Sequence, residues 1–322
     1  MIVCCGEALI DMIQTPVDGL GAVFFPTPGG CPYNTAIAIG RLGAPVQFLG
    51  RCSNDFFGDI VVKRLRDNQV GDDLIIRCKN NTTLAFIKVE EDKEPQYAFY
   101  TEGTADRSLS AEDLPSPLPP STSCIVFGSI SMTMEPLAST IESLIAQVNT
   151  QMKPVIAFDP NIRPIMIPNR DAYMERFKKW AGASTMAKIS AEDFEFLCPG
   201  IEPEQALRTI LDLGTMLAIC TLGPQGAIAM LRRNDGCITV VSAPAIPVSR
   251  IVDTVGAGDT FHGAFLAWLE LRGKMSHAAL AALSEADLRD ALAFANKAAS
   301  IACSRHGAEP PTWEEAERLS AS

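Results

Sequence analysis

Short apolar runs alternate along the sequence with amphipathic segments of helical length, and this alternation strongly limits the folds open to the chain. Apolar runs of roughly 4–8 residues have the length of strands that are buried on both faces. Strands that alternate with helices predict an α/β fold, in which a mostly parallel sheet is covered by helices on both faces. The strand-like runs are MIVCC, VQFLG, CIVFGS, PVIAFDP and MLAICTLG. The helical segments are 31–42, 55–68, 135–147, 171–180 and 203–213, followed by 258–271 and 285–304 in a largely helical last part.

Two segments depart from this alternation. Residues 14–25 and 83–101 alternate apolar and polar side chains around a turn-like Asp-Gly pair and a charged tip. This pattern is typical of half-solvated antiparallel strands. Such strands form either a small lid over a site or an edge pair of hairpins, and the pattern by itself favours neither.

Composition and charge exclude several classes of function. The 322 residues are 47% hydrophobic, as in a well-buried globular protein, and the net charge of −11 predicts no nucleic-acid partner, because phosphate-backbone binding needs a basic surface. The ten cysteines form no C-x-x-C pair, which favours reduced thiols in a cytoplasmic protein. We expect neither a secretory signal nor a membrane span, since MIVCCGEALIDM lacks a basic n-region and no apolar run reaches membrane length. His262, His277 and His306 lie apart and predict neither a metal cluster nor a catalytic triad.

The stretch DTVGAGDTFHGAF is the first candidate for chemistry. Gly256 and Gly258 free the backbone just before a helix expected to begin around Asp259, so successive N–H groups and the helix dipole could hold an anion. It is neither a Walker loop, which needs G-K-[ST], nor a dinucleotide fingerprint, whose third glycine is replaced by Phe261. A plain glycine turn with a helix N-terminal carboxylate explains the pattern equally well. Alternatively, Asp253 and Asp259 beside an anion site would fit a cation ligand and a general base.

Three further groups of residues lie where strands are expected to end. TLGPQGA offers small residues to a ribose or phosphate, although a tight turn between strands explains it as well. Asp11 and Asn34 are suited to the hydroxyls of a polyol, and the alternatives are an exposed Asp and a helix-capping Asn. In FDPNIRP an extended chain would project Asp159, Asn161 and Arg163 to one side, with a structural Asp-Arg pair as the alternative.

Taken in order, these motifs resemble the ribokinase-like, phosphofructokinase-B family of carbohydrate kinases over nearly the whole chain. The matching stretches are GEALID, GGCPYNTAIAIGRLG, DPNIRP, KISAEDFEFL, TLGPQGA and, most specific for the family, DTVGAGDTFHGAF. FGSISMTMEP, DPNIRP and KISAEDF look most like bacterial fructokinases. The resemblance implies one Rossmann-like α/β domain over residues 1–322, with a small β-sheet lid formed by about 12–28 and 82–104. It also implies ATP-dependent phosphorylation of the primary hydroxyl of a ketohexose, expected to be fructose, which gives fructose 6-phosphate.

The resemblance implies a role for each matching position. Asp259 would be the general base, and the N–H groups of Ala257, Gly258 and Asp259, in a turn shaped by Gly256, would form the anion hole. Mg²⁺ together with these N–H groups would replace the lysine that the loop lacks, and Asp253 would serve a monovalent cation, expected to be K⁺. The residues expected to bind the sugar are Asp11, Gly30, Asn34, Phe99 and Arg163. Those expected to bind ATP are Lys188, Thr221, Gly223, Gly226 and Asn296.

One departure from the family pattern concerns the magnesium site. Many relatives carry N-x-x-E, whereas this chain reads SAED at the matching positions, which leaves open whether Glu192 or Asp193 organises Mg²⁺. Alternative substrates are 2-keto-3-deoxygluconate, ribose or a ribosyl compound, and Arg107 and Arg163 keep a carboxylate substrate open. The alternatives from other classes are a catalytically idle sugar-binding regulator and a Rossmann oxidoreductase. A homodimer through the lid is expected from its aromatic residues, Phe24, Phe25, Phe86, Phe99 and Tyr100.

Overall fold

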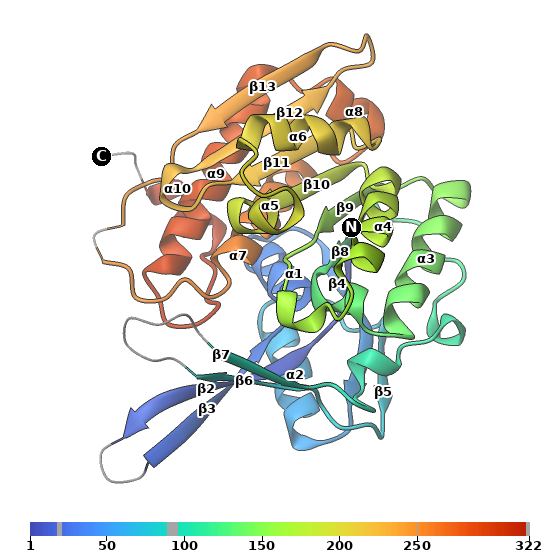
Figure 1. Ribbon diagram of the computed structural model, residues 1–322, viewed down its shortest axis with the longest axis vertical. Coiled ribbons are helices and arrows are strands. Elements are labelled where there is room, and N and C mark those ends of the chain that lie inside the picture. The colour runs from blue at the N-terminus through green and yellow to red at the C-terminus, as the bar shows by residue number, and fades with distance from the viewer. Residues whose placement is uncertain (18–20, 89–95, 249, 320–322) are drawn as a thin grey trace.

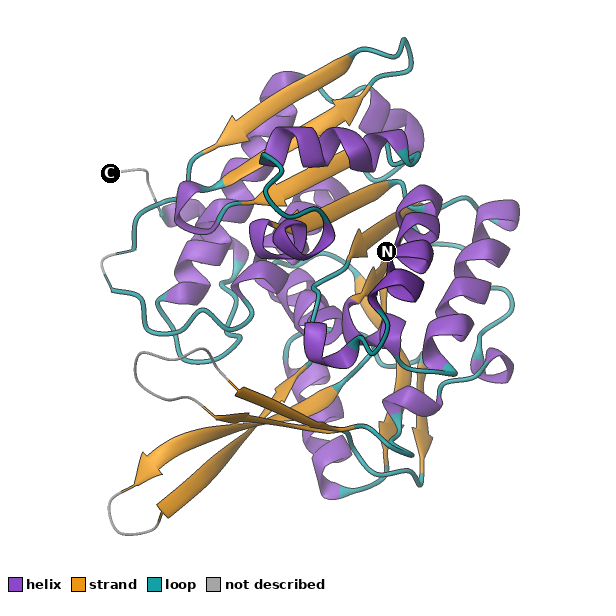
Figure 2. Cartoon of the chain, in the orientation of Figure 1, coloured by secondary structure: helices purple, strands orange, loops and turns teal. Residues whose placement is uncertain are grey.

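A nine-stranded sheet with helices on both faces dominates the computed structural model, which describes residues 1–17, 21–88, 96–248 and 250–319 (Figures 1 and 2). Its strands are β1 Ile2–Cys5, β4 Val46–Ser53, β5 Ile75–Cys78, β8 Cys124–Gly128, β9 Val155–Asp159, β10 Met186–Ser190, β11 Leu217–Thr221, β12 Ala227–Arg232 and β13 Ile238–Ala243. The order is β13-β12-β11-β10-β9-β8-β1-β4-β5. All neighbours pair in parallel except β11 with β12 and β12 with β13. The predicted α/β class is therefore confirmed.

The sheet separates two hydrophobic cores. Side chains of β1 show why its run is wholly apolar: Ile2 and Cys4 lie in one core, and Val3 and Cys5 lie in the other. The helices that contribute to the first core are α1 Cys31–Arg41, α2 Phe56–Asp67, α7 Ala257–Leu271, α8 His277–Ala281, α9 Glu285–Cys303 and α10 Trp313–Arg318. Those of the second core are α3 Leu137–Gln151, α4 Arg170–Ala183, α5 Ala191–Leu197 and α6 Pro203–Asp212. No helix among the described residues is long and apolar enough to cross a lipid bilayer.

The predicted strands and helices are present, with ends shifted by a few residues. The apolar runs did not predict β5, β10, β12 or β13. The strand β10 was missed because Lys188 interrupts its run MAKIS. That lysine is nevertheless only 4% exposed. A strand with a buried charge is invisible to a search for apolar runs, since burial of an ammonium depends on a partner from elsewhere in the chain.

A second sheet of four strands lies apart from the main one, at the bottom of Figure 1. Its strands are β2 Leu9–Val17, β3 Gly21–Gly29, β6 Leu84–Lys88 and β7 Gln96–Tyr100. The hairpins β2–β3 and β6–β7 are antiparallel, and a parallel pairing of β2 with β6 joins them. The expected small sheet is thus confirmed. Residues 18–20 and 89–95 of the predicted lid lie outside the described residues, and the lid role and its limits stay predictions.

Candidate active site

The glycine-rich stretch forms a sharp turn into α7. Gly256 precedes the helix in the left-handed region, with φ 72°, and a Cβ there would lie 2.5 Å from the Cβ of Ala308. Glycine therefore suits this position both by its backbone conformation and by the space available. The N–H of Ala257 donates to a backbone carbonyl within the turn at 3.2 Å, so it is not free for an anion as predicted. Those of Gly258 and Asp259 donate to no residue that the structure describes. Since they belong to the first turn of a 15-residue helix, they form a partially positive surface that can hold an anion.

Asp259 lies in this first turn and is only 6% exposed. Its Oδ2 accepts a hydrogen bond from Nδ2 of Asn34 at 2.9 Å, and its Oδ1 accepts one from Nδ2 of Asn161 at 3.4 Å. Asn34 therefore does not cap α1, and its amide instead holds the carboxylate. Burial raises the pKa of Asp259, the hydrogen bond from Asn34 lowers it, and the negative charge of Asp159 raises it further. A buried carboxylate with a raised pKa is suited to accept a proton near neutral pH.

Asp11, on β2, belongs to the same group. Burial, followed by the negative charge of Asp259, raises its pKa to about 7, and the positive charge of Arg163 partly offsets the rise. A Cβ on Gly29 would lie 2.0 Å from Oδ2 of Asp11, so the glycine leaves room for this carboxylate. The structure thus brings Asp259 and Arg163 within electrostatic reach of Asp11, although the three residues come from distant parts of the sequence.

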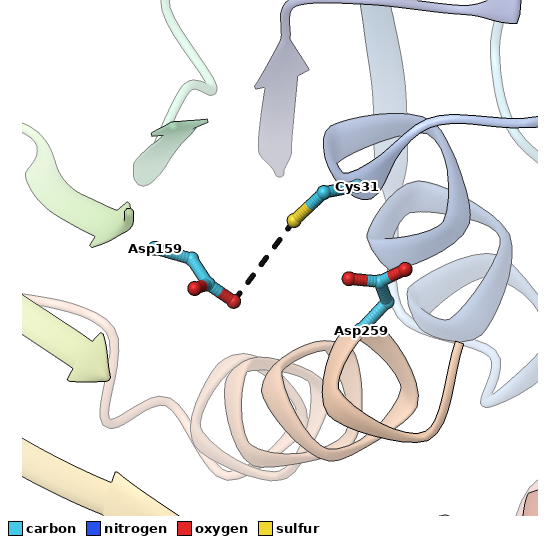
Figure 3. A group of neighbouring side chains, drawn as sticks. All are labelled: Cys31, Asp159 and Asp259. Atoms are coloured by element: carbon cyan, nitrogen blue, oxygen red, sulfur yellow. Dashed lines mark hydrogen bonds between the residues drawn. The ribbon is translucent and has the colours of Figure 1, made fainter. Parts of the chain in front are cut away.

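Asp159 ends β9 and forms a buried ion pair. Its Oδ2 lies 3.0 Å from Nζ of Lys188. The same oxygen accepts a hydrogen bond from the thiol of Cys31, whose Sγ is 4.0 Å away. Figure 3 shows Cys31, Asp159 and Asp259 converging, and their ligand atoms all lie within 4.8 Å of one another. A metal ion could in principle bind there. We assign the position to the Lys188 ammonium instead, because it already pairs with Asp159 and would repel a second cation.

Lys188 also lies against the glycine-rich turn. A Cβ on Gly258 would be 3.1 Å from Nζ of Lys188. Burial lowers the pKa of Lys188, but the carboxylates of Asp159 and Asp193 raise it by more, so the net shift is upward. The prediction that Mg²⁺ and N–H groups supply the positive charge at this turn stays a prediction. The turn has no lysine of its own, but β10 brings a charged lysine to it from elsewhere in the sequence.

FDPNIRP does not continue as an extended chain. Asn161 has a φ of 34°, so the prediction that three side chains project to one side is wrong. Asp159 and Asn161 both contact the group around Asp259, whereas Nη1 of Arg163 donates to the carbonyl oxygens of Asn161 and Ile162. The alternative of an Asp-Arg pair is also wrong, because Asp159 pairs with Lys188.

The family can now be decided by comparison. The model of the pfkB family of carbohydrate kinases matches residues 1–315. The chain belongs to this family. It is 36% identical to a fructokinase of Rhizobium leguminosarum bv. trifolii over 290 residues, which cover 90% of this chain and 86% of the relative.

Two solved structures share the fold of this kinase. The fructokinase of Xylella fastidiosa with bound ATP has a TM-score of 0.87 at 26% identity, and the match covers 98% of this chain and 96% of that one. A double mutant of the Vibrio cholerae O395 fructokinase, with fructose, ADP and a potassium ion bound, has a TM-score of 0.82 at 27% identity. The match covers 98% of this chain and 96% of that one.

The TLGPQGA segment of the kinase is the turn between β11 and β12, as the simpler explanation predicted. Thr221 ends β11, and Gly223 begins the turn with φ 55°. Gly226 has φ 97°, and a Cβ there would lie 2.1 Å from the carbonyl oxygen of Ala243. Asn296, buried on α9, donates to that same carbonyl at 3.0 Å. The structure therefore brings Gly226 and Asn296 together around Ala243, and both N–H groups of the Asn296 amide are used by backbone, since Pro244 accepts the second at 3.1 Å.

The predicted metal residues differ in how their oxygens are used. Asp253 accepts the backbone N–H groups of Val255 and Gly307, each at 2.9 Å, and so connects the glycine-rich turn to the segment after α9. Asp193 is buried, caps α5 with Ser190, and accepts the N–H of Ile162 at 2.6 Å. Glu192 is exposed and makes no hydrogen bond or ion pair with any part of the chain that the structure describes.

Gly30 and Phe99, both predicted to bind the sugar, lie in different surroundings. Gly30 precedes α1 with φ 114°, and a Cβ there would lie 2.7 Å from the carbonyl oxygen of Glu7. Phe99 stacks on Tyr97, with ring centroids 6.0 Å apart, and packs against the second core. Phe99 and Asp11 pair with the same residue of β6, so Phe99 lies two strands away from Asp11 in the same row of the small sheet.

The motifs gave no role to two buried groups next to the site. Glu7, inside GEALID, accepts the N–H of Cys31 at 3.0 Å and the hydroxyl of Ser131, and burial raises its pKa to about 7. His262 is 1% exposed, with Nδ1 3.6 Å from Oδ2 of Asp159, and burial followed by the charge of Lys188 lowers its pKa to about 3. An acid directly after a strand and a histidine three residues after Asp259 were the only signals in the sequence.

Replacing Asp11 should separate stability from function. Its folded pKa of about 7 exceeds the ordinary value of 3.8, so the folded state binds the extra proton between these values and loses stability as the pH rises towards 7. Asp11→Asn is therefore expected to raise the free energy of unfolding at pH 8 by at least about 1 kcal/mol, since each pKa unit corresponds to about 1.4 kcal/mol. The same variant is expected to raise KM for the sugar. Urea unfolding at pH 4.5 and pH 8 measures the change in stability, and steady-state kinetics measures KM for the sugar. A variant less stable than the native chain at pH 8 would contradict the predicted effect of the Asp11 charge.

Proposed function

We propose that this kinase transfers the γ-phosphoryl group of ATP to the primary hydroxyl of fructose and so forms fructose 6-phosphate. The observation that carries the proposal is the buried carboxylate of Asp259, which two amides hold at the start of α7 beside N–H groups that have no partner in the described residues. A base next to an anion site is what transfer of a phosphoryl group to a hydroxyl requires. The fructokinase relatives support the choice of sugar.

In this mechanism Asp259 accepts the hydroxyl proton as the oxygen attacks phosphorus. The N–H groups of Gly258 and Asp259 stabilise the charge on the transferring group, and the Lys188 ammonium adds positive charge beneath them. Asn34 and Asn161 hold the base in place. Asp11, with Arg163 nearby, binds sugar hydroxyls, and Gly30 leaves space for the sugar at the start of α1.

The nucleotide is proposed to lie along the β11–β12 turn, at Thr221, Gly223 and Gly226. Asn296 acts there by holding the backbone at Ala243 rather than through its N–H groups. Mg²⁺ bound with ATP would neutralise phosphate charge during transfer. Glu192 is the better of the two predicted acids for holding its water ligands, because its exposed carboxylate has no partner in the described residues while that of Asp193 caps α5.

An ADP-release assay across sugars tests the proposed substrate. Fructose is expected to give the highest kcat/KM among fructose, ribose, 2-keto-3-deoxygluconate and nucleosides, and ³¹P NMR is expected to show fructose 6-phosphate. Arg107 does not favour a carboxylate substrate, since it pairs with Glu102 at 2.7 Å. A higher kcat/KM for another sugar would make that sugar the substrate instead of fructose. Absence of ADP release with every sugar would favour a catalytically idle sugar-binding protein.

Potassium is expected to activate the enzyme through Asp253. Its two oxygens each accept one N–H group, which leaves lone pairs for a cation beside the glycine-rich turn. Replacing K⁺ by tetramethylammonium is expected to lower kcat by roughly 5- to 150-fold, the usual range of coupling between two sites. Asp253→Ala is expected to lower kcat and abolish the response to K⁺, whereas Asp290→Ala, on an exposed part of α9, should leave both unchanged. Equal activity with both cations would remove the proposed role.

A homodimer through the small sheet is the proposed assembly. Phe25 and Tyr100 are 63% and 62% exposed there, more apolar surface than an isolated sheet usually leaves in water. Sedimentation at micromolar concentration is expected to show a dimer, and Phe25→Glu with Tyr100→Glu is expected to give a monomer. A monomeric native chain would contradict the proposal. The cytoplasmic location expected from the cysteines stays a prediction.

A further inference from the structure

A buried carboxylate next to the site has no part in the mechanism above. This carboxylate belongs to Asp159, which is 1% exposed and has two partners at the site. Its Oδ2 pairs with Lys188 at 3.0 Å, and its Oδ1 accepts the backbone N–H of Asn161 at 3.2 Å. Lys188 lies beneath Gly258, and the side chain of Asn161 donates to Asp259. One carboxylate thus holds the ammonium under the anion site and also the residue that holds the base.

We propose that Asp159 is a positioning residue for phosphoryl transfer, which keeps the Lys188 ammonium fixed beneath the anion site and Asn161 turned towards Asp259. The inference rests on the proposed transfer of a phosphoryl group but not on which sugar accepts it. Asp159 itself touches neither the transferring group nor the sugar in this proposal. It acts only through its two partners.

No neighbouring carboxylate can take over this function. The oxygens of Asp193 already accept hydrogen bonds from Ser190 and from the N–H of Ile162. Those of Asp259 accept hydrogen bonds from Asn34 and Asn161. Burial of an ammonium that is only 4% exposed is strongly unfavourable unless the attraction of a directly paired carboxylate offsets the loss of its water. Asp159 is the only carboxylate within 4.0 Å of Lys188 among the residues that the structure describes. Its negative charge therefore contributes most to keeping the lysine charged in this position, ahead of that of Asp193.

The charged groups around Lys188 give the proposal a pH signature. Burial lowers the pKa of Lys188, and Asp159 makes the largest opposing contribution. Loss of the Asp159 charge should therefore bring the pKa of Lys188 down into the alkaline range that kinetics can reach, as for other buried lysines. The titratable groups that face Lys188 are Cys31 on α1, Asp159 on β9, Asp193 on α5, Cys220 on β11, and Asp259 and His262 on α7.

Asp159→Asn is the test, since the amide has the size of the carboxylate but no charge. With ATP and fructose, kcat is expected to fall about 10²-fold, the cost of a small misplacement of catalytic groups, while KM for fructose changes little. The remaining kcat is expected to fall again at alkaline pH, at a lower pH than in the native enzyme, as the buried lysine loses its proton. In Asp159→Asn with Lys188→Met, kcat is expected to stay low but the additional alkaline fall should disappear.

Each result decides the proposal. A kcat within twofold of the native value in Asp159→Asn overturns it, and so does a low kcat without the alkaline fall, which would mean a purely structural role. If Asp159→Asn does not fold, Asp159→Glu keeps the charge and is expected to retain a native-like alkaline profile with reduced kcat. An alkaline fall in this variant would overturn the proposal. Turnover by the native enzyme tests the proposed function separately, because the inference concerns only the ratio of variant to native rates.

Discussion

Asp259→Asn is expected to lower kcat by about 10²–10⁴-fold, the usual contribution of a general base. The amide has the size of the carboxylate but cannot accept the hydroxyl proton. Its carbonyl oxygen can still accept the 2.9 Å hydrogen bond from Asn34, so the start of α7 should keep its position. Binding of fructose and of a non-hydrolysable ATP analogue, measured by calorimetry, is therefore expected to remain close to native. A variant that retains the native kcat would remove Asp259 from the chemistry.

The stability of the same variant provides a control for folding. The folded pKa of Asp259 is raised by burial, so its contribution to the free energy of unfolding is lost as the pH rises through that pKa. Asp259→Asn lacks this penalty and is expected to unfold at neutral pH with a free energy no lower than that of the native chain. Asp290→Asn, on an exposed part of α9, is the matched variant and should change neither kcat nor stability. A loss of kcat that coincides with unfolding would not count as loss of the base.

Lys188→Met is expected to destabilise the protein by about 3–5 kcal/mol, the usual cost of removing one partner from a buried ion pair. Asp159 would be left 1% exposed, with Cys31, the N–H of Asn161 and Nδ1 of His262 as its remaining neighbours. Asp159→Asn in the same chain removes the unpaired charge and is expected to restore most of the loss. Urea unfolding of the native chain, the two single variants and the double variant completes a double-mutant cycle, which measures the interaction energy between the two side chains. Additive losses would mean that the pair does not act as a unit.

Much of the fold could be predicted from local pattern. A run such as MIVCC is apolar at every position because the sheet buries both of its faces, and the segments between such runs show helical periodicity. The hairpins of the small sheet were predictable from alternation, since one face of each strand is solvated. The strand β10 was not, because its pattern contains a lysine whose partner, Asp159, is 29 residues away in the chain.

The site could be predicted only in part. Spacing alone allowed Asp259 to be a helix-terminal carboxylate, and the order of the motifs along the chain favoured a base. The helix-capping alternative for Asn34 and the extended course of FDPNIRP failed for a common reason. Both were judged from neighbours in sequence, whereas the partner of Asn34 is 225 residues away and that of Asn161 is 98 residues away.

The sequence by itself therefore determined the α/β class and the small sheet, because periodicity is a local property of the chain. Its resemblance to carbohydrate kinases led to the residues proposed for phosphoryl transfer. Only the tertiary structure decided what each of these residues contacts. Parallel strands end at the same edge of the sheet, so β9 and β10 bring Asp159 and Lys188 together beneath the start of α7. The charge on a buried lysine or carboxylate depends on such partners and on exclusion of water, and neither can be seen in a local stretch of sequence.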